Sequence, residues 1–450
     1  MRKWLLGAIA GAGLVGAGVG FTAFAVTTNG NASEKRAQTF KQLELFAEIV
    51  AKAQANYVTE FDESEAIEAA INGMLASLDP HSSYLDPEDF KDMQAQTSGE
   101  YGGLGIEVTA QDGFVKVVSP MDGTPAYRAG IKSGDFLTAI DGKSIVGLPL
   151  NDAVKQMRGD VNSAISVTVV REGVEPFDVS LTREVIRPEV VKQKMVGDVG
   201  YVRVTTFNEQ TVKALDRALE ATRKGPLKGL VLDLRDNPGG LLEASIEVTS
   251  RFVNGGEVVS TRGRHDTDSK RYNAVRANRY PNVPIVVLVN GGSASAAEIV
   301  AGALKDRERA VIMGVTSFGK GSVQTVLPLG PNKGAMRLTT SRYYTPSGKS
   351  IQGSGIEPDV EVAQVRLSEK DIADLKTRAA RYSESALPHA LENDQGAERR
   401  PPHVPADMPP ADYKGEDYQL DQAVALIQAG KAVPKPQTTA AVPAPAPATP

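Results

Sequence analysis

The stretch PIVVLVNGGSASAAEIVAGAL, which runs from Pro284 to Leu304, decides the fold class of this sequence. It begins with a run of branched apolar residues, which predicts a strand buried on both faces. Small residues then predict a tight turn, and we expect a helix to begin near Ser295. A buried strand that passes through a turn into a helix is typical of α/β folds.

Similar strand patterns lie on both sides of this stretch, in VGYVRVTTF (199–207), GLVLDLRDNPGG (229–240) and AVIMG (310–314). A helical pattern, TVKALDRALEATRKG, separates the first two. This alternation predicts an α/β core over residues 187–366. Glycines gather where the strands end, which is where ligands bind in such folds.

Three further regions precede or follow this core. Residues 33–97 contain two helical patterns and predict a small N-terminal helical module. Residues 98–186 contain short β-branched runs between Gly, Asp and Pro turns, which predict a compact β-rich domain. Residues 367–450 are charged and then rich in Pro and Ala, which predicts a largely disordered C-terminal region with a short helix near residues 417–429.

Residues 1–32 predict an export segment. Arg2 and Lys3 precede an uncharged apolar run from Trp4 to Val26, which is long enough to span a bilayer. The AFA sequence near the end of this run is typical of a cleavage site. A cleaved signal peptide and an inner-membrane anchor both stay open, and either would place the remaining chain in the periplasm or cell envelope.

Composition excludes several kinds of site. The chain has 450 residues, a net charge of −5, no cysteine and four histidines. The absence of cysteine excludes disulfides, thiolate metal sites and cysteine nucleophiles. The charge gives no sign of a nucleic-acid-binding surface. We therefore expect no metal, no cofactor and no nucleic-acid partner.

The stretch GVTSFGKGSVQ, from Gly314 to Gln324, begins like a phosphate-binding loop. Such a loop needs Ser or Thr directly after its lysine and a helix that opens there. Here Gly321 follows Lys320, and SVQTVLPL predicts a strand instead. A role in binding nucleotide phosphate is therefore not expected.

A different role for Lys320 follows from the predicted turn at Ser295. A serine hydroxyl at a helix N-terminus is a candidate nucleophile, but it needs a base, and no histidine is placed to serve. A lysine can take that part, as in known Ser–Lys variants of the catalytic triad. Its pKa must then fall by about 3 units through burial. Gln324 is predicted to hydrogen-bond the amine and orient it.

The motifs GSASAAEI, FGKGSVQ and LDLRDNPGG resemble those of the carboxy-terminal processing peptidases, the CtpA-like, tail-specific proteases. YGGLGIEV and RAGIKSGDFLTAIDGKSI resemble two hallmarks of their PDZ domain, and AAINGMLASLDPHSSYL resembles their N-terminal segment. The resemblance covers about residues 35–365 and the DYQLDQAVALI helix. It implies a crotonase- or ClpP-like α/β core with an inserted PDZ domain and a helical dimerisation module.

The resemblance also implies roles for individual residues. Ser295 would be the nucleophile, Lys320 the general base and Gln324 the residue that orients it. The oxyanion hole would use the backbone N–H groups of Ala296 and of Gly239 or Gly240. Glu298 matches an acidic position of the family, and the resemblance leaves its role, structural or catalytic, open. The PDZ carboxylate-binding loop would consist of Gly103, Leu104, Gly105 and Ile106.

The predicted function is that of an exported, ATP-independent serine endopeptidase that cleaves proteins at or near their C-termini. The PDZ domain would recognise the substrate tail. The alternative is a non-catalytic PDZ scaffold that binds peptides on a protease-like fold. Implied partners are protein substrates, further copies of the chain in a homo-oligomer and a lipoprotein adaptor.

Overall fold

The computed structural model describes residues 22–275, 280, 282–371, 374, 383–401 and 403–432, with side chains from Glu34 onward. The chain divides into two compact units, which meet between Ile71 and Asn72. Most of the predicted export segment lies outside the described residues. Within the described residues, no helix combines the length and the apolar character that crossing a membrane requires.

The first unit contains α1 (Thr22–Asn56) and most of α2 (Glu63–Ala76). The ring of Tyr57 packs edge-on against that of Phe61 in the connection between them. α1 leaves several large apolar side chains exposed, namely Phe40, Leu43, Leu45, Phe46 and Ile49. This helix therefore carries an apolar surface that its own unit does not cover.

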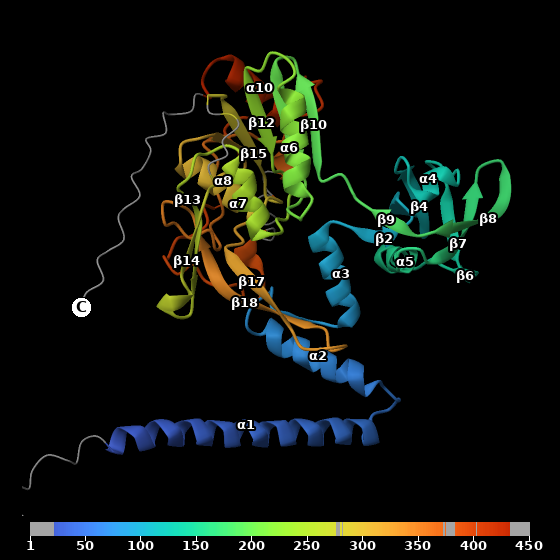
Figure 1. Ribbon diagram of the computed structural model, residues 1–450, viewed down its shortest axis with the longest axis vertical. Helices are drawn as coiled ribbons and strands as arrows, with labels where there is room; N and C mark the ends of the chain where they lie inside the picture. Colours follow the sequence, from blue (N-terminus) through green and yellow to red (C-terminus); the bar gives the residue numbers. More distant parts are fainter. Residues whose placement is uncertain are drawn as a thin grey trace, which may run out of the picture. The chain divides into compact units, whose positions relative to one another are not determined.

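A six-stranded sheet forms the core of the α/β part of the second unit (Figure 1). Its first pair is antiparallel and its remaining pairs are parallel. The two central strands are buried along their whole length, as their apolar sequences predict. In spatial order the strands are β10 (Val191–Val196), β11 (Val199–Val204), β12 (Gly229–Asp233), β15 (Ile285–Val289), β16 (Val311–Gly314) and β19 (Val360–Glu361).

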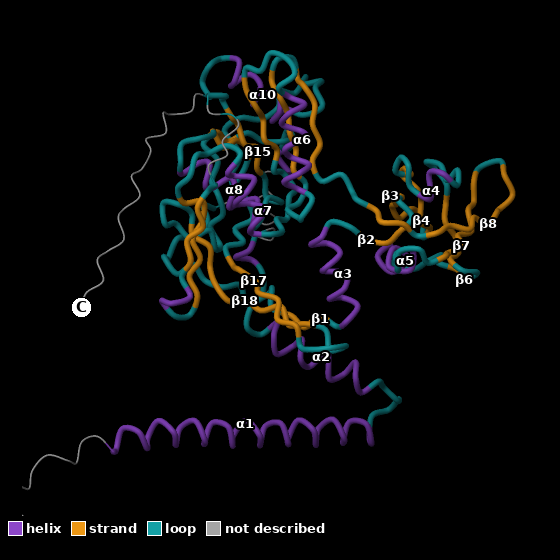
Figure 2. Tube along the Cα trace, viewed as in Figure 1, coloured by secondary structure: helices purple, strands orange, loops and turns teal. Residues whose placement is uncertain are grey.

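Helices pack on both faces of this sheet. The larger apolar core joins one face to α6 (Thr211–Thr222), α7 (Leu242–Ser250) and α8 (Ala296–Asp306). A second core joins the opposite face to α10 (Tyr418–Gln428). Figure 2 shows helices and strands alternating along this part of the chain, which agrees with the predicted α/β core.

A second, antiparallel sheet is organised around β18 (Ala335–Tyr344), and most of its strands lie in sequence between strands of the six-stranded sheet. β18 pairs with β1, β13 and β17. Because β17 begins just after Lys320, this sheet fixes the course of the chain next to the predicted base. Its other strands are β1 (Ser83–Leu85), β13 (Glu257–Gly263), β14 (Lys270–Asn273) and β17 (Ser322–Pro328), and a short helix, η1 (Asp266–Asp268), joins β13 to β14.

The β-rich domain has its own apolar core. The chain enters it from α3 (Pro87–Ser98) along β2 (Tyr101–Gly103) and leaves along β9 (Glu184–Ile186), and these two strands pair. Its sheet has the order β3-β4-β5-β7-β8, so β3 is an edge strand. The elements are β3 (Ile106–Gln111), β4 (Phe114–Pro120), α4 (Pro125–Arg128), β5 (Phe136–Ile140), β6 (Lys143–Ser144), α5 (Leu150–Met157), β7 (Ala164–Arg171) and β8 (Val174–Thr182).

The C-terminal region supplies more to the core than its composition indicates. The expected short helix is α10, and a second short helix, η2 (Glu384–Ala386), lies well before it. Arg399 donates hydrogen bonds to the carbonyls of Phe318 and Thr316. The described part of a region expected to be largely disordered thus contacts the segment that carries Lys320.

Candidate active site

Ser295 lies at the turn between β15 and α8, where the sequence predicts a nucleophile. Its backbone has φ 53° and ψ −115°, a conformation that few residues other than glycine adopt. Strain of this kind persists only where the surrounding structure holds it, and it is concentrated at functional sites. The residue is 7% exposed. It is the N-cap of α8, a buried helix, and the N-terminus of a helix favours negative charge.

Glu298 connects this turn to the segment that carries Lys320. Its carboxylate accepts hydrogen bonds from the backbone N–H of Ser295 at 2.8 Å, of Gly319 at 2.7 Å and of Lys320 at 2.9 Å. The hydroxyl of Ser317 donates a fourth at 2.5 Å. Glu298 is completely buried, and this burial raises the pKa of its carboxyl to about 7 despite the four donors. Glu298 therefore holds the two candidate catalytic segments together.

Lys320 lies in a setting that favours its neutral form. Burial lowers the pKa of its amine below the ordinary value. Glu384, Glu298 and Asp79 act in the opposite direction, whereas the positive charge of Arg337 assists the burial. Among the hydrogen bonds of the described residues, none joins the Lys320 amine to Ser295 or to Gln324. The structure thus brings the two backbones together while the side chains of the dyad stay unbonded to each other.

Gln324 has partners other than the predicted one. The residue lies on β17, and its side-chain amide nitrogen donates to the hydroxyls of Ser322 at 3.0 Å and Thr339 at 3.1 Å. Thr339 in turn donates to the carboxylate of Asp79 at 2.9 Å. Gln324 is therefore tied to the N-terminal LDPHSS segment, and a role in orienting Lys320 stays a prediction.

The predicted oxyanion glycines lie beside the nucleophile. A Cβ added to Gly239 would be 2.8 Å from the Ser295 Cβ and 2.9 Å from the backbone nitrogen of Ala296. The N–H of Gly239 already donates to the Asn237 side chain at 2.9 Å. Within the described residues, the backbone N–H groups of Gly240 and Ala296 have no hydrogen-bond acceptor, so these two donors are free for a ligand.

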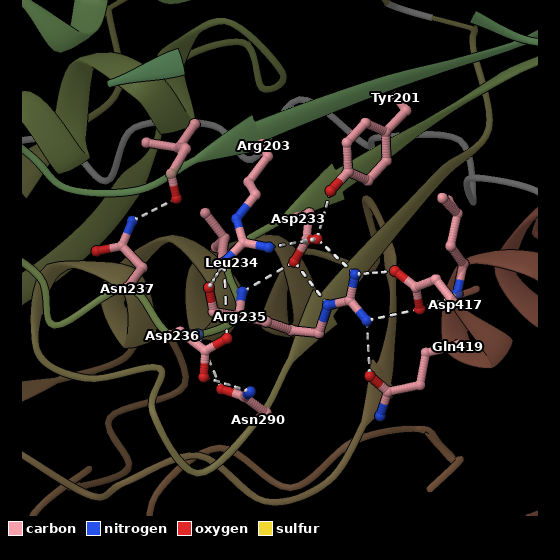
Figure 3. A network of polar contacts seen from close by, with 12 residues as sticks. Tyr201, Arg203, Asp233, Leu234, Arg235, Asp236, Asn237, Asn290, Asp417 and Gln419 are labelled. Carbon is pink, nitrogen blue, oxygen red and sulfur yellow. Dashed lines mark hydrogen bonds and ion pairs between the residues drawn. The ribbon is translucent and has the colours of Figure 1, made fainter. Parts of the chain in front are cut away.

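The glycine loop is anchored by a buried charged network at the end of β12 (Figure 3). Arg235, only 2% exposed, pairs with Asp233 at 2.6 Å and with Asp417 at 2.6 Å. It also donates to the side-chain oxygen of Gln419, and Tyr201 donates its hydroxyl to Asp233. Asp417 and Gln419 belong to the start of α10, so the C-terminal helix fixes the strand end that leads into the loop.

A second connection joins the glycine loop directly to the nucleophile turn (Figure 3). The N–H of Asp236 donates to the Asn290 side-chain oxygen at 2.9 Å, and the Asn290 amide donates back to the Asp236 carboxylate at 2.8 Å. The hydroxyl of Ser293 donates to the carbonyl of Leu234 at 2.7 Å. These bonds keep the two free backbone donors in a fixed relation to Ser295.

The predicted carboxylate-binding loop occupies the start of the edge strand in the β-rich domain. Gly103 ends β2, Leu104 is buried and Ile106 begins β3. Gly105 has φ 74°, and a Cβ there would be 2.3 Å from Thr124, so only glycine fits. The carbonyls of Leu104 and Gly105 accept backbone hydrogen bonds from Ala126 and Met121, which fixes the loop's shape.

Partly buried apolar side chains lie on β3 and α5 of this domain, and an arginine stacks on the residue that begins β2. Ile106 and Val108 on β3 and Leu150 and Val154 on α5 are only partly buried against the domain core. Arg158, directly after α5, stacks 4.3 Å from the centre of the Tyr101 ring. Its Nε is buried and has no hydrogen-bond partner among the described residues.

Several site residues escaped the sequence analysis. Asp417 and Gln419 could not be linked to Arg235 from the sequence, because more than 180 residues separate them from it. The charged residues of LDLRDN, at the end of an apolar strand, did indicate that a buried arginine would need partners there. Arg158 was missed because a single arginine after a helix is usually a solvated residue. No group of three or more potential metal-ligating side chains was found within the described residues.

Family models match three parts of the chain. The model of peptidase family S41 matches residues 198–362, and that of the PDZ domain matches residues 116–171. The model of the N-terminal domain of the activating protease CtpB matches residues 10–89. The first match contains the candidate dyad and the glycine loop, and the second lies within the β-rich domain.

The chain is also similar over most of its length to individual proteases. It is 49% identical over 408 residues to a carboxy-terminal-processing protease of Bartonella bacilliformis, covering 90% of this chain and 91% of the relative. It is 36% identical over 310 residues to the carboxy-terminal processing protease CtpA of Bacillus subtilis, covering 68% and 66%. A solved photosystem II D1 C-terminal processing protease is 30% identical, with a TM-score of 0.43 and coverage of 77% and 98%.

Proposed function

Since the chain belongs to peptidase family S41 and is a serine-type, CtpA-like C-terminal processing peptidase, we propose that it cleaves protein substrates through a dyad of Ser295 and Lys320. The observation that carries this proposal is the shared contact at Glu298. One buried carboxylate holds both the strained turn of Ser295 and the backbone of Lys320. A lysine with a pKa lowered by burial supplies the base that the serine needs.

The proposed reaction has two chemical steps. The neutral Lys320 amine takes the Ser295 hydroxyl proton as the oxygen bonds to the scissile carbonyl carbon. The backbone N–H groups of Gly240 and Ala296 donate to the oxyanion that forms. The Lys320 ammonium then protonates the leaving amine, and the same lysine activates the water that hydrolyses the acyl-enzyme. The proton that this water gives up passes through Lys320 to the Ser295 oxygen as the ester bond breaks. Both residues thereby regain their starting protonation states, and the original serine proton leaves with the amine product.

We also propose that the PDZ domain binds the C-terminal tail of the substrate. The edge strand β3 can accept an extended peptide as an added strand. The terminal carboxylate would then reach the loop from Gly103 to Ile106, with Arg158 beside it as a counter-charge. In this proposal, binding of a tail draws the Lys320 amine onto the Ser295 hydroxyl. An Ile106→Glu variant that cleaves a tailed substrate at the wild-type rate would count against this recognition.

The dyad is tested by single substitutions in the full chain. Ser295→Ala and Lys320→Ala should each abolish cleavage of a fluorogenic peptide with a free, apolar C-terminus. Ser269→Ala and Lys333→Ala, which change exposed side chains of the same types, should leave it unchanged. If Ser295→Ala still binds the peptide and no longer cuts it, the non-catalytic scaffold is excluded. Wild-type cleavage by either dyad variant would refute the assignment.

Export and assembly belong to the same proposal. The apolar run from Trp4 to Val26 supports export to the periplasm or cell envelope, either with a cleaved signal or with an inner-membrane anchor. The exposed apolar residues of α1 support a homo-oligomer, to which a lipoprotein adaptor could add control of activity. Light scattering with and without residues 33–60 tests the oligomer. Fractionation of cells that express the full chain tests export.

A further inference from the structure

The segment that carries Lys320 is held on both sides by residues far from it in sequence. On one side, the backbone N–H of Glu384 donates to the carbonyl of Phe318 at 3.1 Å. On the other side, the N–H of Gly321 donates to the side-chain oxygen of Gln352 at 3.0 Å. The amide nitrogen of Gln352 donates to the Glu384 carboxylate at 3.0 Å. Glu384 thus reaches both ends of the Lys320 segment, once through its backbone and once through Gln352.

The Glu384 carboxylate is buried and has a specific partner. It is 1% exposed, and Gln352 is completely buried. A buried carboxylate is costly unless it is hydrogen-bonded or paired. His81 supplies the pairing, because its Nε2 lies 2.9 and 3.0 Å from the two carboxylate oxygens. Among the described residues no lysine or arginine hydrogen-bonds this carboxylate, so the His81 imidazole and the Gln352 amide are its side-chain partners.

We propose that Glu384 is a positioning residue for Lys320, that Gln352 transmits this positioning to Gly321, and that His81 controls how much of the Glu384 charge the lysine amine experiences. This inference rests on the proposed role of Lys320 as the base. It assigns a task to the LDPHSS segment and to the short helix η2 at Glu384–Ala386.

A purely structural role would predict something different. If Glu384 and His81 only stabilised the fold, their replacement would lower stability and leave the pH dependence of catalysis unchanged. If Glu384 acts on the Lys320 amine, the charge matters. Glu384 raises the pKa of Lys320, as do Glu298 and Asp79, whereas burial and Arg337 lower it. The pH profile therefore separates the two roles.

The two substitutions should move the profile in opposite directions. Activity rises with pH as the lysine loses its proton, so the acidic limb of kcat/KM reports its titration. Glu384→Gln removes a negative charge and should move this limb to lower pH, by about half a unit or more. His81→Asn leaves the Glu384 charge without its partner and should move the limb to higher pH. Gln352→Ala should lower kcat by about tenfold or more, because Gly321 loses its acceptor.

The experiment measures kcat/KM of the full-length protein between pH 5 and about 10.5, a span set by the ordinary pKa of lysine, with a fluorogenic peptide that ends in apolar residues and a free carboxylate. Glu392→Gln and His389→Asn are matched controls, since both residues are exposed and lie in the same C-terminal region. Thermal unfolding of each variant confirms that it is folded. Should Glu384→Gln not fold, His81→Asn decides alone, because its side chain is 17% exposed.

The outcomes distinguish this inference from the proposed function. Opposite shifts in Glu384→Gln and His81→Asn, with unmoved controls, support the positioning role. An acidic limb that stays in place in both variants overturns it while Lys320→Ala remains inactive. An active Lys320→Ala protein would instead remove the proposed base, and with it the premise of this inference.

Discussion

The backbone N–H groups of Ser295 and Lys320 share one acceptor atom, Oε2 of Glu298, at 2.8 and 2.9 Å. The strain of the serine turn and the course of the lysine segment therefore depend on the same buried carboxylate. The other oxygen, Oε1, accepts from Ser317 and Gly319, so both oxygens are engaged. Glu298 is a positioning residue, which gives a concrete task to a position whose role the sequence left open.

Replacing Glu298 by glutamine should impair catalysis more than binding. A glutamine side chain has only one acceptor oxygen. Its NH₂ group would face the two N–H or O–H donors that the other carboxylate oxygen now accepts from, and these would lose their acceptor. We expect kcat of Glu298→Gln to fall by about 10²-fold with KM little changed, and unfolding to become easier by about 2 kcal/mol. Steady-state kinetics and urea unfolding measure both. Glu369→Gln, on an exposed position, is the control, and a wild-type kcat in Glu298→Gln would contradict this role.

The stability of the protein should depend on pH through the same residue. The pKa of Glu298 is raised from an ordinary 4.5 to about 7 because the group is buried. The folded state therefore binds this proton more tightly than the unfolded chain does. The resulting stabilisation is complete below about pH 4.5 and is lost as the pH rises through about 7, by roughly 3 kcal/mol. Urea unfolding at several pH values should show this loss in the wild type, and a Glu298→Gln protein with the same slope would disprove the attribution.

The glycine loop should not tolerate side chains. Gly240 has φ 138°, and a Cβ there would lie 2.0 Å from the carbonyl oxygen of Phe207. Gly240→Ala must therefore displace the free N–H, and losing an oxyanion donor costs about 10²- to 10³-fold in kcat. Gly225→Ala is a suitable control, because its Cβ would meet nothing within 4 Å. An unimpaired Gly240→Ala enzyme would place the oxyanion hole elsewhere.

The Arg235 network should be essential for stability. Arg235→Met leaves the carboxylates of Asp233 and Asp417 without their shared partner, and breaking a buried ion pair in this way costs about 3–5 kcal/mol. Asp417→Asn should cost less, since Asp233 still pairs with the arginine. Arg271→Met removes an exposed ion pair and should change little. Equal unfolding curves for Arg235→Met and Arg271→Met would contradict this ranking.

Arg158 should contribute to tail binding. We expect Arg158→Met, made in the Ser295→Ala protein, to bind a peptide with a free C-terminus about tenfold or more weakly, because a charge-assisted contact is lost. A peptide with an amidated C-terminus should bind both proteins equally. Titration calorimetry measures the affinities, and Lys143→Met serves as an exposed control in the same domain. An equal loss for the amidated peptide would mean that Arg158 does not act on the carboxylate.

The sequence predicted the parts of the site that depend on local patterns. The strand, turn and helix around Ser295 follow from a run of apolar residues, small residues and a helical period within 21 residues, and the structure contains β15 and α8 there. The α/β core and the β-rich domain were predicted for the same reason. In each case the residues that form a strand, turn or helix are close together in the sequence, so their pattern is visible without the structure.

The remaining parts depend on contacts between distant segments. His81 and Glu384 are 303 residues apart, and Arg235 and Asp417 are 182 residues apart. No local pattern marks such pairs, since a buried glutamate in a charged, Pro-rich region looks like a solvated one. Gln324 shows the same limit, because its observed partner Thr339 arrives only through the pairing of β17 with β18.

The contact of Arg235 with the first turn of α10 has a practical side for anyone who produces this protein. The Pro-rich sequence before Asp417 makes it a natural point at which to truncate a recombinant version. Such a version would lose Asp417, the counter-ion of the buried Arg235, and the side chains of Leu420 and Ile427, which cover one apolar face of the sheet. Shortened expression products should therefore retain the chain through Ala432, and fusion partners at that end need a spacer beyond it.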